Sequence, residues 1–340
     1  MKKISRGFLI LIFLIESLSA SNTFPEKFDS LGPSVKQILT EKNRVVHYID
    51  DGDFNDIPVV FVGGLGTSVR AIRLLDFLRT MREDLGIRII SIERNGFGQT
   101  EFNSNLTISD YVQDVEEVLN HLKINKFSIF GISGGGPYAS RIAAKNGPRV
   151  ASLHMAATPA NIGSKALCEP TGENSAYASL LAYPMKFFGF PKSSSIHKLE
   201  GFQDTAYDEA ARAHNVRGQS ADPTPLIHEM SLLCKDGVTD TSLLETDVYV
   251  YRGEADDLLI HEPEVSWKKN YLKANVTIRS YPGEGHDVQY RHLDQILLDI
   301  AGQGPEVLIC LKGNHEMIIP SKVSQSISDG ASLGLCHWEN

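Results

Sequence analysis

The chain has few cysteines and little clustered positive charge, and each shortage excludes a class of protein. Only four cysteines occur among 340 residues, and their spacing does not fit a zinc site. The formal net charge is −9, and lysine and arginine form no basic run beyond the extreme N-terminus. Because phosphate binding needs clustered lysine and arginine, we expect no nucleic-acid partner.

Long hydrophobic runs are also missing, and the most apolar stretch is the short run 7–15 near the N-terminus. A helix needs about 20 apolar residues to cross a bilayer, so this run is too short to form a stable membrane span. Basic residues precede it, and Ser17 and Ser19 place small residues at positions −3 and −1 of a cut before Ala20. We therefore predict a signal peptide over 1–20 and a secreted or periplasmic protein; a cut after Ala20 and an uncleaved anchor are the alternatives.

An even number of cysteines in an exported chain favours two disulfides, for which three connectivities exist. We favour Cys168–Cys234 and Cys310–Cys336, because each pair would link a local segment. Buried free thiols are the alternative. The sequence also contains two glycosylation sequons, which begin at Asn105 and Asn275.

Short apolar runs alternate with helical patterns along most of the chain. Such alternation predicts an α/β fold with a mostly parallel, doubly wound sheet that helices cover on both faces. Thr107 and Asp110 form the pattern of a capping box at the start of one helix. We expect strands at 43–50, 57–62, 87–92, 127–130, 150–156, 247–251 and 275–281. We expect helices at 72–85, 107–122, 139–144, 266–272 and 293–300.

The alternation stops between 160 and 245, where prolines and aromatic residues accumulate and 205–214 has helical character. We predict a mainly helical lid there, because the segment is too apolar for the alternative, a disordered linker. After 302 the sequence has one apolar run, 307–311, and then no clear pattern, so we assign no role to this tail. We predict five segments: a signal peptide (1–20), a first part of the core (21–159), a lid (160–245), a second part of the core (246–302) and a C-terminal tail (303–340).

One predicted strand runs directly into Gly131-Ile-Ser133-Gly-Gly135, and a helical pattern follows. The pattern G-x-S-x-G between a strand and a helix is typical of a nucleophile elbow. Such a tight turn needs small neighbours at −2 and +2 of the serine, and the helix N-terminus favours developing negative charge. The motif predicts that Ser133 is a nucleophile; a glycine-rich turn without function is the alternative.

A serine nucleophile needs a base, and the base needs an acid to orient it. His286 and Asp256 each follow a predicted strand, at the edge of the sheet where α/β proteins bind ligands. The order Ser133, Asp256, His286 is the nucleophile–acid–base order of α/β-hydrolase triads. Asp257 and Glu254 compete for the role of the acid. His286 has ten competing histidines for the role of the base, including His154, His261 and His315.

An oxyanion hole needs backbone N–H groups, and the sequence offers two suitable loops. Gly134 follows the nucleophile, and Gly64, with Leu65 as its rival, follows the first apolar strand. A plain turn at 63–66 is the alternative. These glycines match neither a phosphate-binding loop nor a clean G-x-G-x-x-G pattern, so we expect no cofactor. The cysteine spacing does not fit zinc, and we expect no metal.

Five short motifs occur in a fixed order between about 43 and 300. They are Val62-Gly-Gly-Leu-Gly66, Glu93-Arg-Asn-Gly-Phe-Gly98, Gly131-Ile-Ser-Gly-Gly135, Gly253-Glu-Ala-Asp256 and Gly285-His286. In this set the chain resembles the α/β-hydrolase fold superfamily, in its lid-containing serine hydrolase type. It departs from the usual pattern where Val62 replaces a histidine and Glu93 replaces an aspartate. The resemblance places the lid after the sixth strand of the fold.

The resemblance implies a carboxylesterase-like or lipase-like enzyme that works through an acyl-enzyme. Ser133 would attack a carbonyl carbon, His286 would act as base, and Asp256 would orient His286. The amides of Gly64 and Gly134 would hold the oxyanion. A serine nucleophile disfavours epoxide hydrolases and haloalkane dehalogenases. The expected partner is a small, apolar acyl substrate with an ester, amide, lactone or diketone C–C bond; an acyltransferase and a non-catalytic binding protein are the alternatives, and the oligomeric state is not predicted.

Overall fold

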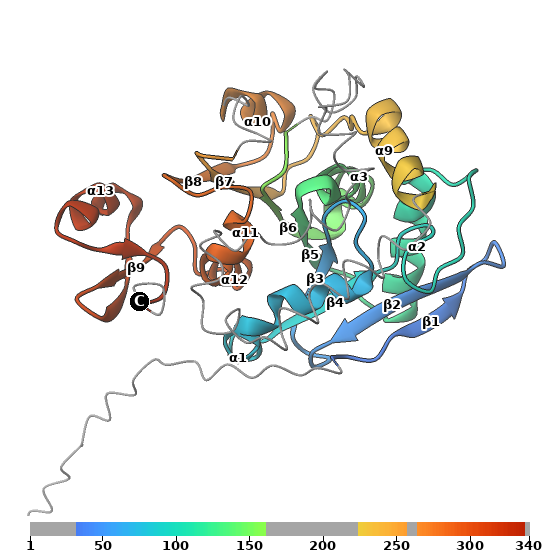
Figure 1. The fold of residues 1–340 in the computed structure, drawn as a ribbon, viewed down its shortest axis with the longest axis horizontal. Coiled ribbons are helices and arrows are strands. Elements are labelled where there is room, and N and C mark those ends of the chain that lie inside the picture. The colour runs from blue at the N-terminus through green and yellow to red at the C-terminus, as the bar shows by residue number, and fades with distance from the viewer. Residues whose placement is uncertain (1–31, 161–223, 257–263, 337–340) are drawn as a thin grey trace, which may run out of the picture.

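An eight-stranded sheet forms the centre of the protein (Figure 1). The computed structural model describes residues 32–160, 224–256 and 264–336. The strand order is β1-β2-β4-β3-β5-β6-β7-β8, with β1, β2 and β4 paired antiparallel and the other neighbours paired parallel. The strands are β1 (Lys36–Leu39), β2 (Val45–Asp51), β3 (Ile57–Val62), β4 (Ile87–Ile92), β5 (Phe127–Ile132), β6 (Val150–Ala156), β7 (Asp247–Gly253) and β8 (Val276–Tyr281). The mostly parallel sheet and all of its expected strands are confirmed, whereas β1 was not predicted.

Helices cover both faces of this sheet, because its central strands are apolar on both sides. Successive residues of a strand point to opposite faces. In β3, Val59 and Phe61 belong to one hydrophobic cluster, and Val60 and Val62 belong to the other. Strands buried on both sides are the near-continuous apolar runs that parallel sheets require, and every residue of β4 and β5 is buried.

The cluster around Val59 and Phe61, here the first, packs against η1 (Val69–Leu78), α1 (Arg79–Asp84) and α12 (Leu293–Ile300). The second cluster, around Val60 and Val62, packs against α2 (Ile108–His121), α3 (Gly136–Asn146) and α10 (Glu264–Asn270). The expected helix 72–85 begins earlier than predicted and starts as a 3-10 helix. At the start of α2, Thr107 accepts a hydrogen bond from the Asp110 amide and donates its own amide to the Asp110 carboxylate, which confirms the capping box. The remaining short helices are η2 (Ser133–Gly135), η3 (Gly147–Arg149) and α11 (Val288–Arg291).

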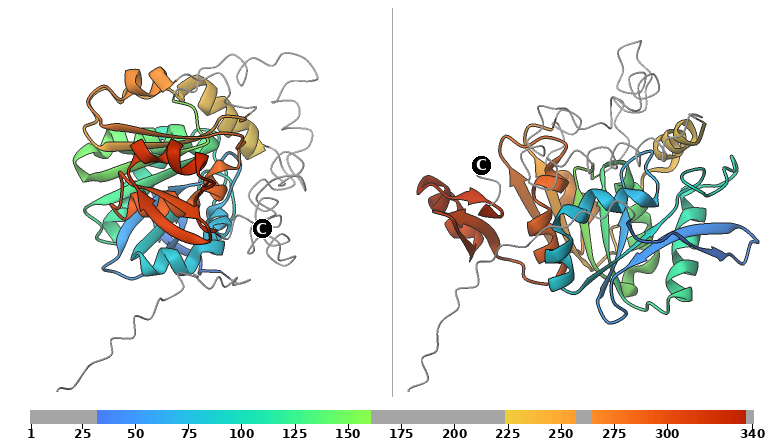
Figure 2. Two further views of the ribbon diagram at one scale, coloured as in Figure 1. Left: turned by 90° about the vertical axis from the view of Figure 1, so that its left-hand side faces the viewer. Right: turned by 60° about the horizontal axis from the view of Figure 1, so that its bottom comes forward.

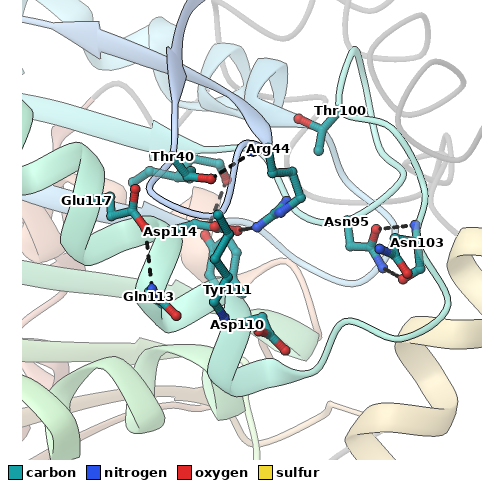
Figure 3. Close-up of polar contacts among 12 residues, drawn as sticks. Thr40, Arg44, Asn95, Thr100, Asn103, Asp110, Tyr111, Gln113, Asp114 and Glu117 are labelled. Atoms are coloured by element: carbon teal, nitrogen blue, oxygen red, sulfur yellow. Dashed lines mark hydrogen bonds and ion pairs between the residues drawn. The ribbon is translucent and has the colours of Figure 1, made fainter.

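The turn between β1 and β2 is anchored on α2 (Figure 3). Arg44 forms an ion pair with Asp114, whose carboxyl is mostly buried. The backbone amide of Glu41 donates to the Glu117 carboxylate at 2.8 Å. These contacts hold a largely exposed edge hairpin whose strand β1 has little apolar pattern of its own.

The connection from β6 to β7 contains the predicted lid, most of which lies outside the described residues. The expected helical stretch at 205–214 lies outside them as well. Within the described part, α9 (Thr224–Asp236) packs Leu226 and Met230 against Leu65 in the loop after β3. Among the residues that the structure describes, no helix is long and apolar enough to cross a bilayer.

The C-terminal tail is a small folded unit at the opposite end of the molecule from the β1–β2 hairpin (Figures 1 and 2). It consists of β9 (Val307–Leu311), β10 (Asn314–Ile318), α13 (Pro320–Ser328) and β11 (Ser332–Leu333), with the strands in the order β10-β9-β11. The apolar run 307–311 is β9; the other elements were not predicted. The predicted disulfide Cys310–Cys336 is confirmed, whereas the Cys168–Cys234 prediction involves a residue outside the described part of the chain.

Buried side chains of α12 attach this tail unit to the core. The carboxylate of Asp294 accepts from the Leu335 amide at 2.7 Å, and Gln295 accepts from the Leu308 amide at 2.8 Å. Asp294 is completely buried. A buried carboxylate is costly unless hydrogen bonds satisfy it, so these contacts bind the tail unit to the core.

Candidate active site

Ser133 occupies a strained turn between β5 and α3. Its φ is +49°, in the left-handed region that residues with a Cβ rarely adopt. A methyl group at Gly131 would lie 2.7 Å from the Ala139 Cβ, and one at Gly135 would lie 2.3 Å from the Val62 carbonyl oxygen. Both flanking positions therefore require glycine, which is the steric signature of the predicted elbow.

The structure brings Ser133, His286 and Asp256 into one hydrogen-bonded chain. The His286 Nε2 lies 2.9 Å from the Ser133 Oγ, and its Nδ1 lies 2.8 Å from the Asp256 Oδ2. The Asp256 side chain is 2% exposed and that of His286 is 30% exposed. The Asp256 carboxylate is thus shielded from water, while the His286 ring next to the serine keeps access to solvent.

Gly253 allows the loops that carry Asp256 and His286 to meet. A methyl group at this position would lie 2.3 Å from the Glu284 carbonyl oxygen and 2.4 Å from that of Gly285. The close approach is fixed by backbone hydrogen bonds, since the Ala255 amide donates to the Glu284 carbonyl at 2.9 Å. The loops after β7 and β8 therefore form one unit that holds Asp256 beside His286.

The competing residues lie elsewhere or outside the described residues. His154 is completely buried and bonded to Ser152 and Tyr251. His315 accepts a hydrogen bond from the Cys336 amide at 2.8 Å, within the tail unit. Glu254 is exposed. The last two rivals, Asp257 and His261, lie outside the described part of the chain.

The loop after β3 lies beside the serine, as expected for an oxyanion loop. A methyl group at Gly64 would lie 3.6 Å from the Ser133 Cβ. One at Gly134 would lie 2.8 Å from the Leu65 Cβ and 3.1 Å from the Leu65 amide nitrogen. Both predicted donors, and the rival Leu65, are therefore grouped around Ser133.

Two buried charged residues that the sequence analysis missed hold this loop from behind. Arg94, just after β4, donates to the carbonyl oxygens of Gly63 at 2.9 Å and Gly64 at 2.5 Å. Its Nε also donates to the Glu229 carboxylate at 2.5 Å, and the second oxygen of Glu229 accepts from the Gly66 amide at 2.7 Å. Arg94 is 4% exposed and Glu229 is 3% exposed. The sequence did contain a signal for Glu229, since this charged residue lies on the same face of α9 as the buried Leu226, Met230 and Leu233.

Glu93 and Val62, the two residues that depart from the superfamily pattern, are both buried and both make contacts near the site. Glu93 accepts from the Val69 amide at 2.6 Å, and so ties the end of β4 to the start of η1. Burial raises the pKa of Glu93 to about 7. Val62 is completely buried in the second hydrophobic cluster, so an apolar contact stands where the pattern has a histidine.

The described residues contain no group of three or more His, Cys, Asp or Glu side chains that could hold a metal ion.

Comparisons with known proteins agree with the fold. A family model described as alpha/beta hydrolase fold matches residues 57–188. A carboxylesterase from the thaumarchaeon Nitrososphaera gargenis has 18% identity and a TM-score of 0.61, covering 79% of this chain and 99% of its own. An esterase from Exiguobacterium antarcticum has 15% identity and a TM-score of 0.60, covering 79% and 99%. An enol-lactonase from Burkholderia xenovorans LB400 has 15% identity and a TM-score of 0.60, covering 78% and 98%.

None of the curated proteins compared matches the sequence significantly. The sheet order and the similar structures nevertheless define the fold of this protein. The chain has the α/β-hydrolase fold, as its five motifs indicated, and residues 57–188 match the model of that family.

Proposed function

We propose that this protein is a serine hydrolase that cleaves a carbonyl ester through Ser133, His286 and Asp256. The observation that carries the proposal is the unbroken chain of contacts from the Ser133 hydroxyl through the His286 ring to the Asp256 carboxylate, at 2.9 and 2.8 Å. Nucleophile, base and orienting acid are each within hydrogen-bond reach of the next, which is the geometry that a serine triad needs.

In the proposed mechanism, the Ser133 oxygen attacks the carbonyl carbon while its proton moves to the His286 Nε2. The Asp256 carboxylate stabilises the imidazolium that forms and keeps the ring in the correct tautomer. The amides of Gly64 and Gly134 stabilise the oxyanion, and the N-terminus of α3 adds favourable dipole potential. His286 then protonates the leaving alcohol, and water activated by the same ring releases the acid from the acyl-enzyme.

The proposed substrate is a small, apolar acyl ester, and related amides, lactones or diketone C–C bonds are the other carbonyl substrates of this chemistry. The names of the similar structures, a carboxylesterase, an esterase and an enol-lactonase, support a carbonyl substrate. The proposal includes export from the cytoplasm. The signal-peptide pattern supports it, and so does the Cys310–Cys336 disulfide, because disulfides persist mainly in oxidising compartments.

A fluorophosphonate probe and a panel of p-nitrophenyl esters test the proposal on the full chain. We expect the probe to label the wild-type protein and the Ser109→Ala control, since Ser109 is an exposed residue of α2, and not to label Ser133→Ala. Labelling of Ser133→Ala at the wild-type level would remove Ser133 as nucleophile. Release of p-nitrophenol only with an added alcohol would indicate an acyltransferase, and stoichiometric labelling without turnover would indicate a binding protein.

A further inference from the structure

Helix α9 contacts the loop after β3 through both an apolar and a charged contact. Leu226 and Met230 pack against Leu65, and Glu229 accepts a hydrogen bond from the Gly66 amide. The loop consists of residues 63–66 and is called the oxyanion loop below. Helix α9 belongs to the long connection between β6 and β7, so a segment distant in sequence contacts the loop beside Ser133 from behind.

Arg94 makes three directed contacts in this arrangement. Its Nε donates to Glu229, its Nη1 to the Gly63 carbonyl and its Nη2 to the Gly64 carbonyl. A guanidinium is planar and presents its donors in a fixed fork, so these contacts define the directions of both carbonyls at once. The guanidinium also lies 5.3 Å from the centre of the Tyr138 ring on α3, which limits its movement further.

The direction of a carbonyl determines the direction of the next amide, because a peptide unit is planar and trans. The Gly63 carbonyl shares its plane with the Gly64 N–H, and the Gly64 carbonyl shares its plane with the Leu65 N–H. These two N–H groups are the two alternative oxyanion donors of the loop. Arg94 therefore fixes the orientation of the donor, whichever of the two amides is used.

Because Arg94 and Glu229 are both buried, each residue needs the other to hold the oxyanion loop. Arg94 and Glu229 are both nearly inaccessible to water, and a buried charge without a partner is strongly unfavourable. Without the Glu229 carboxylate, the Arg94 guanidinium would lose its counter-charge and the Gly66 amide would lose its acceptor. Glu229 thus holds Arg94 in place and holds the far end of the loop directly.

We propose that Arg94 and Glu229 are positioning residues, which set the peptide planes of the oxyanion loop before substrate binds and make the rate of the chemical step depend on the position of α9. The inference rests on the proposed serine hydrolase function. It assigns to Glu229 an effect on transition-state stabilisation, and not on substrate binding, because neither side chain needs to contact the substrate.

The test compares Glu229→Gln with Asp299→Asn, a matched loss of charge at a second buried arginine pair. Asp299 is completely buried and pairs with Arg279 at 2.6 Å, away from the oxyanion loop. With the loop released, Glu229→Gln is expected to lower kcat on a p-nitrophenyl ester by about 10- to 100-fold, with KM within about threefold of wild type. Asp299→Asn, assayed at the same folded fraction, is expected to keep the wild-type kcat. Glu229→Asp, which keeps the charge, is expected to recover part of the loss.

Amide hydrogen exchange of the peptide around 60–68 adds a readout that does not depend on turnover. We expect faster exchange in Glu229→Gln than in wild type, and no change in Asp299→Asn. An unchanged kcat in Glu229→Gln, an equal loss in both variants, a change confined to KM, or unchanged exchange would each overturn the inference. If wild type lacks Ser133-dependent labelling, the proposed function fails; if wild type reacts normally and Glu229→Gln does too, only the inference fails.

Discussion

The Tyr251 hydroxyl lies between the Nδ1 of His154, at 2.9 Å, and the Oδ2 of Asp299, at 2.7 Å. Asp299 in turn accepts two hydrogen bonds from Arg279. These side chains form a buried polar network that joins β6, β7, β8 and α12 inside the core. Because the histidine is completely buried, its pKa falls to about 3, and the ring is neutral near pH 7.

Replacing this histidine should reduce the sensitivity of the protein to acid. The pKa of His154 is about 3 in the native state and about 6.5 in the unfolded chain, so only the unfolded chain takes up this proton as the pH falls below about 6.5. Stability is then lost progressively down to about pH 3. Between about pH 7 and about pH 4, we expect the free energy of unfolding to fall roughly 2–3 kcal/mol more in wild type than in His154→Gln.

Urea denaturation of both proteins at the two pH values measures this difference. Burial raises the pKa of Asp76 to about 6 and that of Glu93 to about 7, so these two groups increase the free energy of unfolding as the pH falls, opposite to the effect of His154. Both groups occur in both proteins, so the difference between the two pH dependences gives the contribution of His154 to the free energy of unfolding. Equal pH dependence in the two proteins would show that His154 does not stay neutral in the folded state.

A pair of neighbouring carboxylates allows the assignment of the acid to be tested. Asp256→Asn removes the charge beside the His286 Nδ1, so we expect kcat to fall by about 10³- to 10⁴-fold with little change in KM. Asp257→Asn changes the adjacent residue in the same way and should leave kcat near the wild-type value. Ester turnover by the two variants decides between them, and the reverse pattern would make Asp257 the acid.

The contact between Gly134 and Leu65 predicts how the oxyanion loop responds to one added methyl group. In Gly134→Ala the new Cβ would lie 2.8 Å from the Leu65 Cβ, so the loop must move away from Ser133. We expect a loss of about 10- to 100-fold in kcat. Gly147→Ala is the control, because its new Cβ would meet only the Leu244 Cδ1, at 4.0 Å. Wild-type kinetics in Gly134→Ala would mean that the loop tolerates this displacement.

Removing the tail disulfide should affect stability more than chemistry. Cys310 and Cys336 are 26 residues apart, and a loop of this size corresponds to about 3.5 kcal/mol of stabilisation. We expect the double variant Cys310→Ser/Cys336→Ser to be cleaved faster by protease within the tail unit. The rate of fluorophosphonate labelling, per folded molecule, should be unchanged. Loss of labelling in a folded variant would show instead that the tail supports the site.

The sheet and the serine turn could be predicted because their signals are local. Buried parallel strands are continuous apolar runs, and the elbow combines a strand, a serine and glycines within a few residues. Strand β1 and the tail unit apart from β9 lack such signals. Three of the four residues of β1 are exposed, and no residue of α13 is buried. Patterns of apolar residues therefore carried little information about these elements.

The support of the oxyanion loop could not be predicted because it depends on contacts between distant segments. Glu229 and Gly66 are 163 residues apart in sequence and 2.7 Å apart in the structure. Asp256 and Asp257 follow the same strand, so their positions in the sequence separate them little. The contact of Asp256 with His286 supports Asp256 as the proposed acid, and this contact depends on the close approach of the two loops at Gly253.

The positive φ of Ser133 makes folding stability and the proposed chemistry compete for one residue. A residue with a Cβ in this region costs about 1 kcal/mol relative to glycine, so Ser133→Gly should be more stable than Ser133→Ala and at least as stable as wild type. Thermal unfolding of the three proteins measures this order. Any screen that enriches variants of this chain for heat resistance alone would consequently favour glycine at position 133, and so select proteins without the proposed nucleophile.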